Sequence, residues 1–448
     1  MNQFEQYKRL IKLGFALILV ALLTGLYGVI WINWYNKIIW APFFRRGNWM
    51  MIFIYGLLLI FFMQLYGGFK IALLKRGNLI YSQILAVVVT NIITYFQISV
   101  QDKKFTAPAP LVVNLIGAVV IILAWTMTFL WLYRGMFPPR ELLLISGDHS
   151  DYHLIEKMNV REDKYIISQI VSYHEGPERI KAEIAKYDSV IVGDIPAHER
   201  NYIIKYCFGQ NIRTYSVPKI SDILLRSSVE LNLFDSPLLL SRNNQGLQIE
   251  QEIMKRIIDI VGSLIGIVIT IPIFLIVGIC IKMTDGGPVI YQQTRLTKNG
   301  KKFQIYKFRT MVQNAEADGK ARLASEGDPR ILPIGRVLRA TRLDELPQIY
   351  NILKGDMSIV GPRPERPELA AELEKEIPEF SFRLQVKAGL TGYAQVYGKY
   401  NTTPYDKLKL DLTYIRNYSV LEDLKLIIMT PKIMLMKEST EGVKEEQK

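Results

Sequence analysis

Four long apolar runs in the first third of the chain constrain its fold more than any other feature. They span residues 11–32, 50–65, 79–98 and 111–132. A helix needs about 20 apolar residues to cross the hydrocarbon core of a bilayer, with a usual range of about 17–25. Each run is therefore a plausible membrane span, the second being the shortest. We predict a region of four transmembrane helices over residues 1–139.

The charges and aromatic residues around these runs indicate how they lie. The first run follows a basic segment, as a secretory signal would, but it continues into an aromatic belt at Trp31, Trp34 and Tyr35 without a small-residue cleavage pattern. Four spans return the chain to the side on which it started. Lysines and arginines are modestly more frequent on that side, which predicts that the remainder of the chain faces the cytoplasm.

Composition limits the chemistry available to the rest of the chain. Cys207 and Cys280 lie far apart, which excludes a thiolate zinc site, and the four histidines all fall between residues 149 and 198. Beyond that stretch, catalysis must use carboxylates, lysine, arginine or hydroxyl groups. The net charge is +13 in 448 residues, but we expect no nucleic-acid partner.

Residues 140–246 alternate short apolar strands with amphipathic helices. This alternation is typical of a parallel α/β sheet, so we predict a Rossmann-like domain. The turn at 146–150 lacks the G-x-G-x-x-G pattern that lets a backbone approach a pyrophosphate, so we do not expect dinucleotide binding. A polar, turn-rich segment at 241–246 then separates this domain from residues 247–448.

A fifth apolar run, at 257–281, has two interpretations. One is a further span. The other is a re-entrant helix over 256–282, because Pro272 lies near the centre of the run and bends it, and because a fifth span would carry the rest of the chain to the opposite side. We favour re-entry, with Asp259 pairing with Lys255 and Arg256 at the level of the lipid headgroups.

Residues 302–311 read as a strand, and period-two alternation places Lys307 and Arg309 on one of its faces. Two neighbouring cations can bind a phosphate-bearing ligand or can simply contact anionic headgroups. The pattern does not decide between these roles.

Asp344 and Glu345 form the central acidic pair. Pro347 is tolerated in a first helical turn and Gly355 supplies a stop, so we predict a helix that begins near Asp344, with Thr341 in capping register. The ordinary interpretation is that the acids cap this helix. The functional one depends on nearby arginines such as Arg342: a carboxylate held there can act as a nucleophile toward phosphorus or hold Mg²⁺.

The segment 361–367 contains three prolines, which stiffen it, and presents Arg363 and Arg366 beside Pro364. A preorganised guanidinium can grip a phosphate in bidentate fashion. Taken alone this motif is weak, since proline-arginine loops are also common linkers.

Six motifs, in order, resemble the bacterial polyprenyl-phosphate phosphoglycosyl transferases, monotopic enzymes that begin capsule, exopolysaccharide and O-antigen units. Between residues 255 and 437 these motifs read K-R-I-I-D-I-V-G-S, G-P-V-I-Y-Q-Q-T-R, K-F-R-T-M, R-L-D-E-L-P-Q, M-S-I-V-G-P-R-P and G-L-T-G-Y-A-Q-V. The four-span region and α/β domain look like those of the long-form members. The implied fold is mixed: four transmembrane helices, a Rossmann-like domain, and a catalytic α+β domain at 247–448 with a re-entrant membrane helix.

The resemblance implies a role for each residue named above. Asp344 would attack a UDP-sugar and release UMP, and undecaprenyl phosphate would then take the sugar phosphate. Glu345 would serve metal binding or acid/base work, with Asp344 and Glu345 holding Mg²⁺. The implied substrate-binding residues are Lys307, Arg309, Arg342, Arg363, Pro364 and Arg366. The residues implied at the membrane and the lipid phosphate are Lys255, Arg256, Asp259 and Pro272, the last replacing the family's usual Ser-Pro break with Ile-Pro.

Two other function classes stay open at this point. One is a membrane-anchored binding or regulatory protein whose transferase domain is inactive, and the intact set of motif residues argues against it. The other is a nucleotide-dependent sugar-modifying enzyme built on the α/β domain, which the missing glycine-rich turn disfavours. We expect a multi-pass protein of the bacterial cytoplasmic membrane with its catalytic domain in the cytoplasm. The sugar is open, with glucose and galactose as first guesses, and a homodimer is one hypothesis for the α/β domain.

Overall fold

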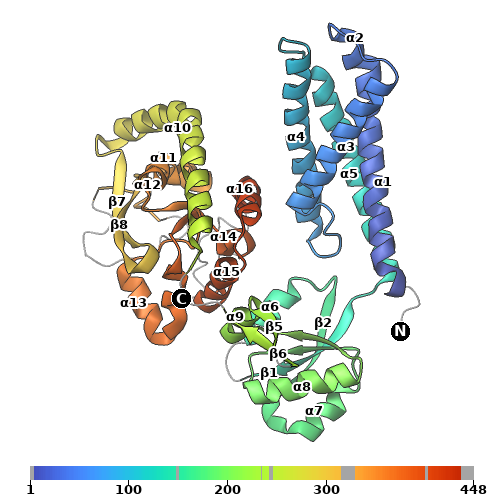
Figure 1. Ribbon diagram of the computed structural model, residues 1–448, viewed down its shortest axis with the longest axis vertical. Coiled ribbons are helices and arrows are strands. Elements are labelled where there is room, and N and C mark those ends of the chain that lie inside the picture. The colour runs from blue at the N-terminus through green and yellow to red at the C-terminus, as the bar shows by residue number, and fades with distance from the viewer. Residues whose placement is uncertain are drawn as a thin grey trace. The chain divides into compact units, whose positions relative to one another are not determined.

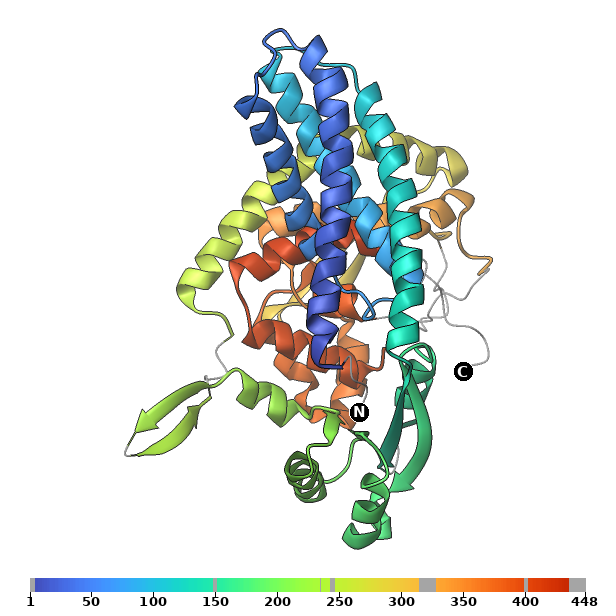
Figure 2. The same cartoon turned by 90° about the vertical axis from the view of Figure 1, so that its right-hand side faces the viewer.

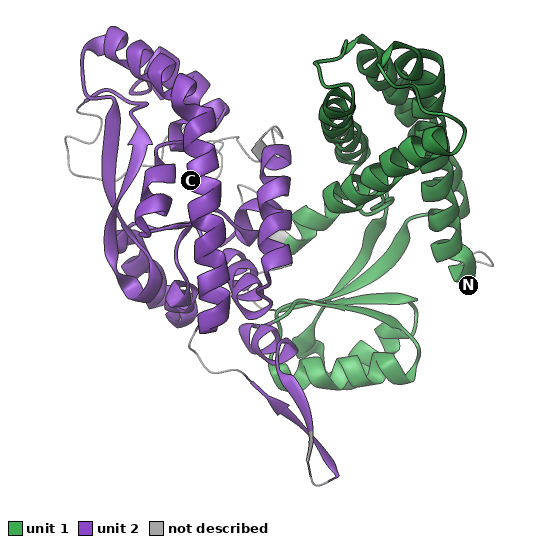
Figure 3. Ribbon diagram, turned by 45° about the horizontal axis from the view of Figure 1, so that its top comes forward, with its two compact units in different colours: residues 1–218 green, residues 219–448 purple. Residues whose placement is uncertain are grey.

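The computed structural model describes residues 5–147, 151–233, 235–241, 246–313, 328–398 and 402–434. The chain divides into two compact units, residues 1–218 and 219–448 (Figure 3). Each unit has its own secondary structure and its own buried core.

The first unit begins with a bundle of four long helices (Figure 2). The helices are α1 (Lys8–Ile30), α3 (Arg46–Tyr66), α4 (Arg76–Gln101) and α5 (Ala109–Met136). After α1 the chain continues through a π-helical turn (Trp31–Tyr35) and the short α2 (Asn36–Ile38). Each of the four apolar runs falls within this helical region, and all four long helices are long and apolar enough to cross a membrane. The expectation of four candidate spans is therefore confirmed.

Polar side chains connect the helices inside this bundle. Asn114 of α5 donates from Nδ2 to the hydroxyl of Tyr55 and to Oδ1 of Asn91, both at 3.0 Å. Tyr55 in turn donates to the same oxygen of Asn91 at 3.0 Å and stacks on Tyr27 of α1. Because these groups are buried, each needs such partners. The network therefore links all four helices at one level.

A four-stranded parallel sheet follows directly on α5, as predicted. Its strands are β1 (Arg140–Ser146), β2 (Tyr165–Ser172), β3 (Ser189–Val192) and β4 (Arg213–Ser216), in the order β2-β1-β3-β4. Apolar residues of β1 and β3 pack on one face against α7 (Pro177–Ile184) and α8 (Ala197–Gly209), and on the other against α6 (Asp151–Asn159). The turn expected at 146–150 lies partly outside the described residues.

The segment after β4 packs with the second unit. Helix α9 (Ile220–Arg226) places Ile220 and Ile223 in one apolar core with Leu408 and Leu412. A hairpin of β5 (Val229–Leu233) and β6 (Ser236–Leu240) follows. Residues 219–246, which we assigned to the α/β domain from the sequence, are therefore grouped with the transferase motifs in the structure.

The rest of the second unit is mainly helical, with two further pairs of strands. An antiparallel pair joins β7 (Ile290–Leu296) to β8 (Lys302–Phe308), and a parallel pair joins β9 (Ser358–Val360) to β10 (Gly389–Thr391). The helices are α10 (Ile249–Asp285), α11 (Pro333–Ala340), α12 (Gln348–Lys354), α13 (Pro367–Glu376), α14 (Tyr393–Tyr397), α15 (Pro404–Arg416) and α16 (Val420–Met434).

Helix α10 has 37 residues, includes Pro272, and turns sharply along its length (Figure 1). Its first part packs on β9 and α12, where Gly262 lies against Ile359. Its last part packs on β8 and α11, where Ile281 joins Phe308 in a buried cluster. Only 11% of its most apolar stretch is buried within the protein. A long apolar surface of α10 is thus left uncovered while both of its ends contact the same unit.

Candidate active site

Asp344 and Glu345 lie in a single 3-10 turn, Leu343–Glu345, between α11 and α12. The expected helix start near Asp344 corresponds to this 3-10 turn, and the α-helix α12 follows from Gln348. Thr341 does not cap the turn: its hydroxyl donates to the carbonyl of Val337 in α11. The chain reverses at Arg342, whose φ of 57° is in the left-handed region, and this reversal turns both acids inward, where they are buried.

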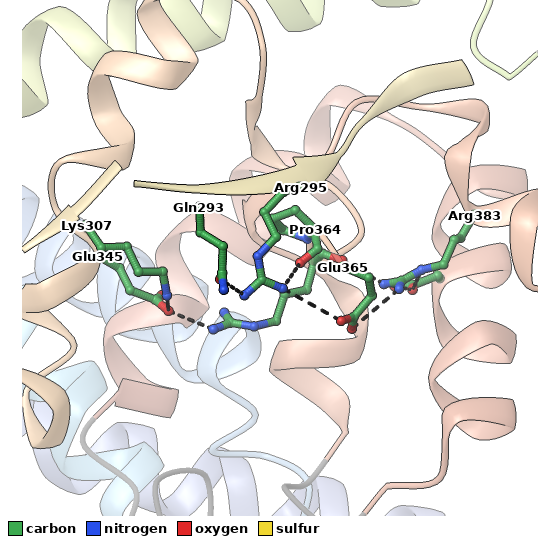
Figure 4. Close-up of polar contacts among 9 residues, drawn as sticks. Gln293, Arg295, Lys307, Glu345, Pro364, Glu365 and Arg383 are labelled. Atoms are coloured by element: carbon green, nitrogen blue, oxygen red, sulfur yellow. Dashed lines mark hydrogen bonds and ion pairs between the residues drawn. The ribbon is translucent and has the colours of Figure 1, made fainter. Parts of the chain in front are cut away.

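Glu345 is held by two cations from different elements. Lys307 of β8 donates from Nζ to Oε1 at 3.0 Å, and Arg363 donates from Nη2 to the same oxygen at 2.7 Å (Figure 4). Burial alone would raise the pKa of Glu345, but Arg363 and Lys307 outweigh it, with Arg342 adding to their effect, and hold this pKa well below its usual range. Glu345 is therefore a fixed carboxylate.

Asp344 has a different electrostatic setting from its neighbour. The residue is only 9% exposed, and this burial raises its pKa. Lys307 draws the pKa back down, and the charge of Glu345 adds to the rise. Arg339, which donates to the Thr310 hydroxyl at 2.9 Å, also favours the ionised form. Asp344 is thus a poorly solvated carboxylate beside several cations, which is a reactive condition for an oxygen nucleophile.

The side chains of Lys307 and Arg309 have different partners. Burial lowers the pKa of Lys307, and Glu345 opposes this shift. Arg309 follows the end of β8 and turns to Asp285 at the end of α10, with Nη1 and Oδ2 at 2.5 Å, and Nε donates to the carbonyl of Pro288 at 2.6 Å. Strand β8 ends at Phe308, although the backbone N–H of Arg309 still donates to the carbonyl of Val289 at 2.9 Å. The two cations expected on one strand face thus have side chains with different partners.

Arg363 lies on a loop whose carbonyl groups are held one after another. The carbonyl of Pro362 accepts from the backbone of Gly389, that of Arg363 from Arg383, that of Pro364 from Arg295, and that of Glu365 from the backbone of Leu296. Prolines 362 and 364 have no N–H to satisfy. Four consecutive acceptors therefore fix the loop, as the stiffness of its sequence predicted, and Arg366 ends it as the residue before α13.

A buried ion network supports this loop and was not foreseen from the sequence. Arg383 donates from Nη2 to Asp411 at 2.8 Å, and its Nη1 lies 3.7 Å from Glu365. Arg295 bridges Gln293 and Pro364 (Figure 4). Arg383 and Asp411 lie outside the motifs, and Gln293 and Arg295 lie inside one but were assigned no role. Only the folded chain shows that they support the loop.

Gly361 begins the loop at a point where there is no room for a side chain. A Cβ atom there would lie 2.3 Å from the backbone oxygen of Lys387. Gly389 and Gly392 belong to the glycine motif that pairs with this loop. A Cβ atom on either of them would lie equally close to the backbone of Gly361. The glycines therefore allow the backbones of the two motifs to pack directly together beneath Arg363.

The residues expected at the membrane are engaged by protein groups. Lys255 donates to Asp423 at 2.7 Å, and Arg256 donates to the carbonyls of Ile352 and Leu353 at the end of α12. Asp259 accepts from the hydroxyl of Ser358 and the backbone of Ile359. The expected pairing of Asp259 with Lys255 and Arg256 is therefore wrong. Each of these side chains bonds α10 to a different element: Lys255 to α16, Arg256 to α12 and Asp259 to β9.

Few groups are available for a metal among the described residues of this unit. Among the described residues no three histidine, cysteine or acidic side chains gather to form a metal site. Asp344 and Glu345 provide only two acidic side chains. The two cations that pair with Glu345 both contact its Oε1. A donor set of two carboxylates fits Mg²⁺ only when the ligand's own phosphate oxygens complete the coordination, which is how this ion is commonly bound.

Two buried carboxylates thus lie beside cations that come from separate motifs of the second unit. A family model described as "Bacterial sugar transferase" matches residues 250–437, which include every residue of the site. A glucose-1-phosphate transferase of Caulobacter vibrioides, acting from UDP-glucose to undecaprenyl phosphate, is 37% identical over 189 residues, covering 41% of this chain and 70% of that protein. The chain belongs to the bacterial sugar transferase family.

Two larger relatives are matched over more of this chain. An N-acetylgalactosaminephosphotransferase of Aeromonas hydrophila, named for UDP-N-acetylgalactosamine and undecaprenyl phosphate, is 35% identical over 56% of this chain and 59% of its own length. An undecaprenyl-phosphate galactose phosphotransferase of Salmonella typhimurium is 36% identical over 50% of this chain and 49% of its own. The matched part of the chain thus spans about half the length of these two relatives.

Proposed function

We propose that the protein transfers a sugar 1-phosphate from a UDP-sugar to undecaprenyl phosphate, forming undecaprenyl-diphospho-sugar as the first membrane step of capsule or exopolysaccharide synthesis. The observation that carries this proposal is the contrast between the two adjacent acids. Glu345 is neutralised by Lys307 and Arg363, whereas burial raises the pKa of Asp344. Glu345 is therefore suited to a structural role, and Asp344 is suited to act as a nucleophile.

In the first step Asp344 attacks the phosphorus that bears the sugar. A bond forms between a carboxylate oxygen and this phosphorus as the bond to the bridging oxygen breaks, and UMP leaves with that electron pair. Arg363, on its fixed loop, would bind the nucleotide phosphate, for which a planar guanidinium is suited. Positioning and charge neutralisation supply most of the rate in such reactions, and a loop fixed by four carbonyl contacts suits that task.

In the second step a phosphate oxygen of the lipid attacks the same phosphorus. The bond to Asp344 breaks, the carboxylate regains its electron pair, and the sugar phosphate leaves as part of a diphosphate linked to the lipid. No proton is gained or lost by the enzyme over both steps. This is consistent with a site that contains no histidine.

Mg²⁺, when bound, would neutralise phosphate charge. Asp344 and Glu345 are the residues that would hold it, together with the phosphate oxygens of the ligand. Because Lys307 and Arg363 already occupy one oxygen of Glu345, we infer that Glu345 has mainly a positioning role and that its hold on a metal is secondary.

We further propose that α10 enters the membrane and returns to the same face. A straight helix of 37 residues would extend about 55 Å, well beyond the hydrocarbon core of a bilayer. Asp259 near one end and Ile281 near the other both contact the second unit. Re-entry keeps these contacts and places the uncovered apolar surface in lipid, with the catalytic unit on the cytoplasmic side.

The test of the proposed function is release of UMP by the purified protein with Mg²⁺ and a panel of UDP-sugars, with and without undecaprenyl phosphate. The relatives described above are named for glucose, galactose and N-acetylgalactosamine, so these three sugars come first. Lipid-dependent turnover with one sugar, absent in Asp344→Asn, supports the proposal and identifies the donor. Folded protein that releases no UMP with any of the sugars would favour the binding-protein alternative.

A further inference from the structure

A cavity of about 350 Å³ lies within the first unit, at the junction of its helix bundle and its sheet. Its walls come from the first turns of α1, the last turns of α5, and the amino ends of β1, β2 and β4. The volume falls in the range of small-molecule sites, about 300–1,000 Å³. None of the motifs of the transferase unit contributes to it.

The lining of this cavity is strongly cationic. Two acids, Glu5 and Asp163, face eight basic residues: Lys8, Arg9, Lys12, Arg76, Arg134, Arg140, Lys164 and Arg213. The cavity wall therefore carries a formal excess of six positive charges. Burial lowers the pKa of Lys164, and the nearby Arg161 lowers it further, which reflects the cost of gathering these charges.

The two acids cannot balance this charge. Glu5 pairs with Arg140 and is shared with Lys8, at 3.6 Å, and Arg213, at 3.7 Å. Asp163 lies 3.5 Å from Arg134. Both carboxylates thus already form ion pairs with cations at the edge of the cavity.

Aromatic rings hold the lysine ammonium groups inside the cavity. Lys12 Nζ lies 5.5 Å from the ring centre of Tyr133, and Lys164 Nζ lies 4.6 Å from that of Tyr165. A ring face steadies a cation without neutralising it. These ammonium groups are consequently positioned for an anion that the described part of the chain does not supply.

We propose that this cavity is a binding site for a phosphate-bearing ligand, whose phosphate is gripped between Lys12 and Lys164. If the basic residues served only to orient the helices in the membrane, they would need only to lie in the water beside it. Here they converge on one pocket from α1, α4, α5, β1, β4 and the turn before β2. The same phosphate chemistry is offered by the headgroup of an anionic phospholipid and by a soluble organic phosphate. The position at the ends of two candidate spans suits a headgroup.

Lysine acetylation read by peptide mass spectrometry tests this site in the full-length protein. The chain is placed in bilayers of neutral phosphatidylcholine, to which either phosphatidylglycerol or soluble pyrophosphate is added. We expect Lys12 and Lys164 to become protected, while Lys103 and Lys104, in the exposed turn at the far end of the bundle, do not. Protection by the lipid alone assigns a headgroup, and protection by pyrophosphate assigns a soluble ligand. Unchanged labelling with both would overturn the proposal.

Two single substitutions give an independent measurement. Lys12→Ala and Lys164→Ala should each weaken binding of the protecting anion about tenfold, since a charge-assisted hydrogen bond to phosphate is lost. Lys103→Ala is the matched control and should leave binding unchanged. Lys307 in the same digest reports on the transferase site, so a ligand bound there is recognised as such. Full affinity in both folded variants would contradict the proposal.

Discussion

Arg363 donates to Oε1 of Glu345 across 2.7 Å, from a loop to a turn 18 residues earlier in the chain. Lys307 of β8 meets the same oxygen. A single acidic oxygen thus joins three separate sequence motifs, and it does so one residue away from Asp344. We regard this junction as the element that fixes Asp344 beside Lys307 and Arg363.

Arg363→Lys should lower kcat/KM at least about 100-fold, because an ammonium group cannot bind phosphate and Glu345 together as a planar guanidinium does. Lys375→Ala, an exposed change on the nearby α13, is the matched control. Steady-state UMP release measures both. Near-normal kcat/KM in the lysine variant would show that the fork geometry of Arg363 is not needed.

Asp344→Asn should make the protein inactive and also more stable at neutral pH, by up to about 1 kcal/mol. Burial raises the pKa of Asp344 in the folded state, so the folded state binds a proton more tightly than the unfolded one. The stabilisation from this group is therefore present in acid and lost as the pH rises through the folded pKa. Thermal melting at pH 7 measures the gain, and the variant should lose this advantage as the pH is lowered.

Glu345→Gln should have the opposite effect and destabilise the protein at neutral pH, by about 1–3 kcal/mol. The folded pKa of Glu345 lies below its ordinary value, so its contribution is present above the unfolded pKa and is lost as the pH falls through the folded one. Melting curves of the two neighbouring variants make a matched pair. Equal shifts of the same sign would contradict the different roles assigned to the two acids.

Arg383→Ala should destabilise the second unit by about 3–5 kcal/mol, because it leaves Asp411 buried without its cation. It also frees the carbonyl of Arg363. The double variant Arg383→Met with Asp411→Leu removes both charges and should recover part of the stability but not the activity. Recovery of both would mean that the loop does not depend on Arg383 for its position.

The proposed re-entry of α10 predicts where single cysteines can be labelled. Cysteines at exposed Lys205 and Lys301, one in each unit, should react with an impermeant reagent only after the membrane is opened. A cysteine at Lys104 should react in intact cells. The same labelling pattern in Pro272→Leu would show that the proline alone does not decide re-entry. Labelling of a cysteine at 301 in otherwise unchanged protein before the membrane is opened would indicate a fifth span.

Periodic features were predictable from the sequence, because they depend on neighbours along the chain. The four long apolar helices and the parallel sheet follow from apolar spacing alone. The acids at 344 and 345, the cation at 307 and the stiff loop at 361–367 were also identified in advance, and the fold brings them together.

Features that depend on where an element stops were not predictable. A strand that ends after Phe308 directs Arg309 to Asp285, and a left-handed residue at Arg342 replaces the expected helix cap by a tight turn. The ion pair between Lys255 and Asp423 joins residues that are 168 positions apart in the chain. Such contacts are fixed by tertiary packing, for which the local sequence carries no signal.

The most direct test of the account is the mass of the protein after exposure to its UDP-sugar without any lipid. We predict a covalent gain of one sugar phosphate, on the peptide that contains Asp344, together with one equivalent of UMP, and loss of the adduct when undecaprenyl phosphate is added. An active enzyme that forms no adduct and releases UMP only when the lipid is present would contradict the role of Asp344 as the nucleophile.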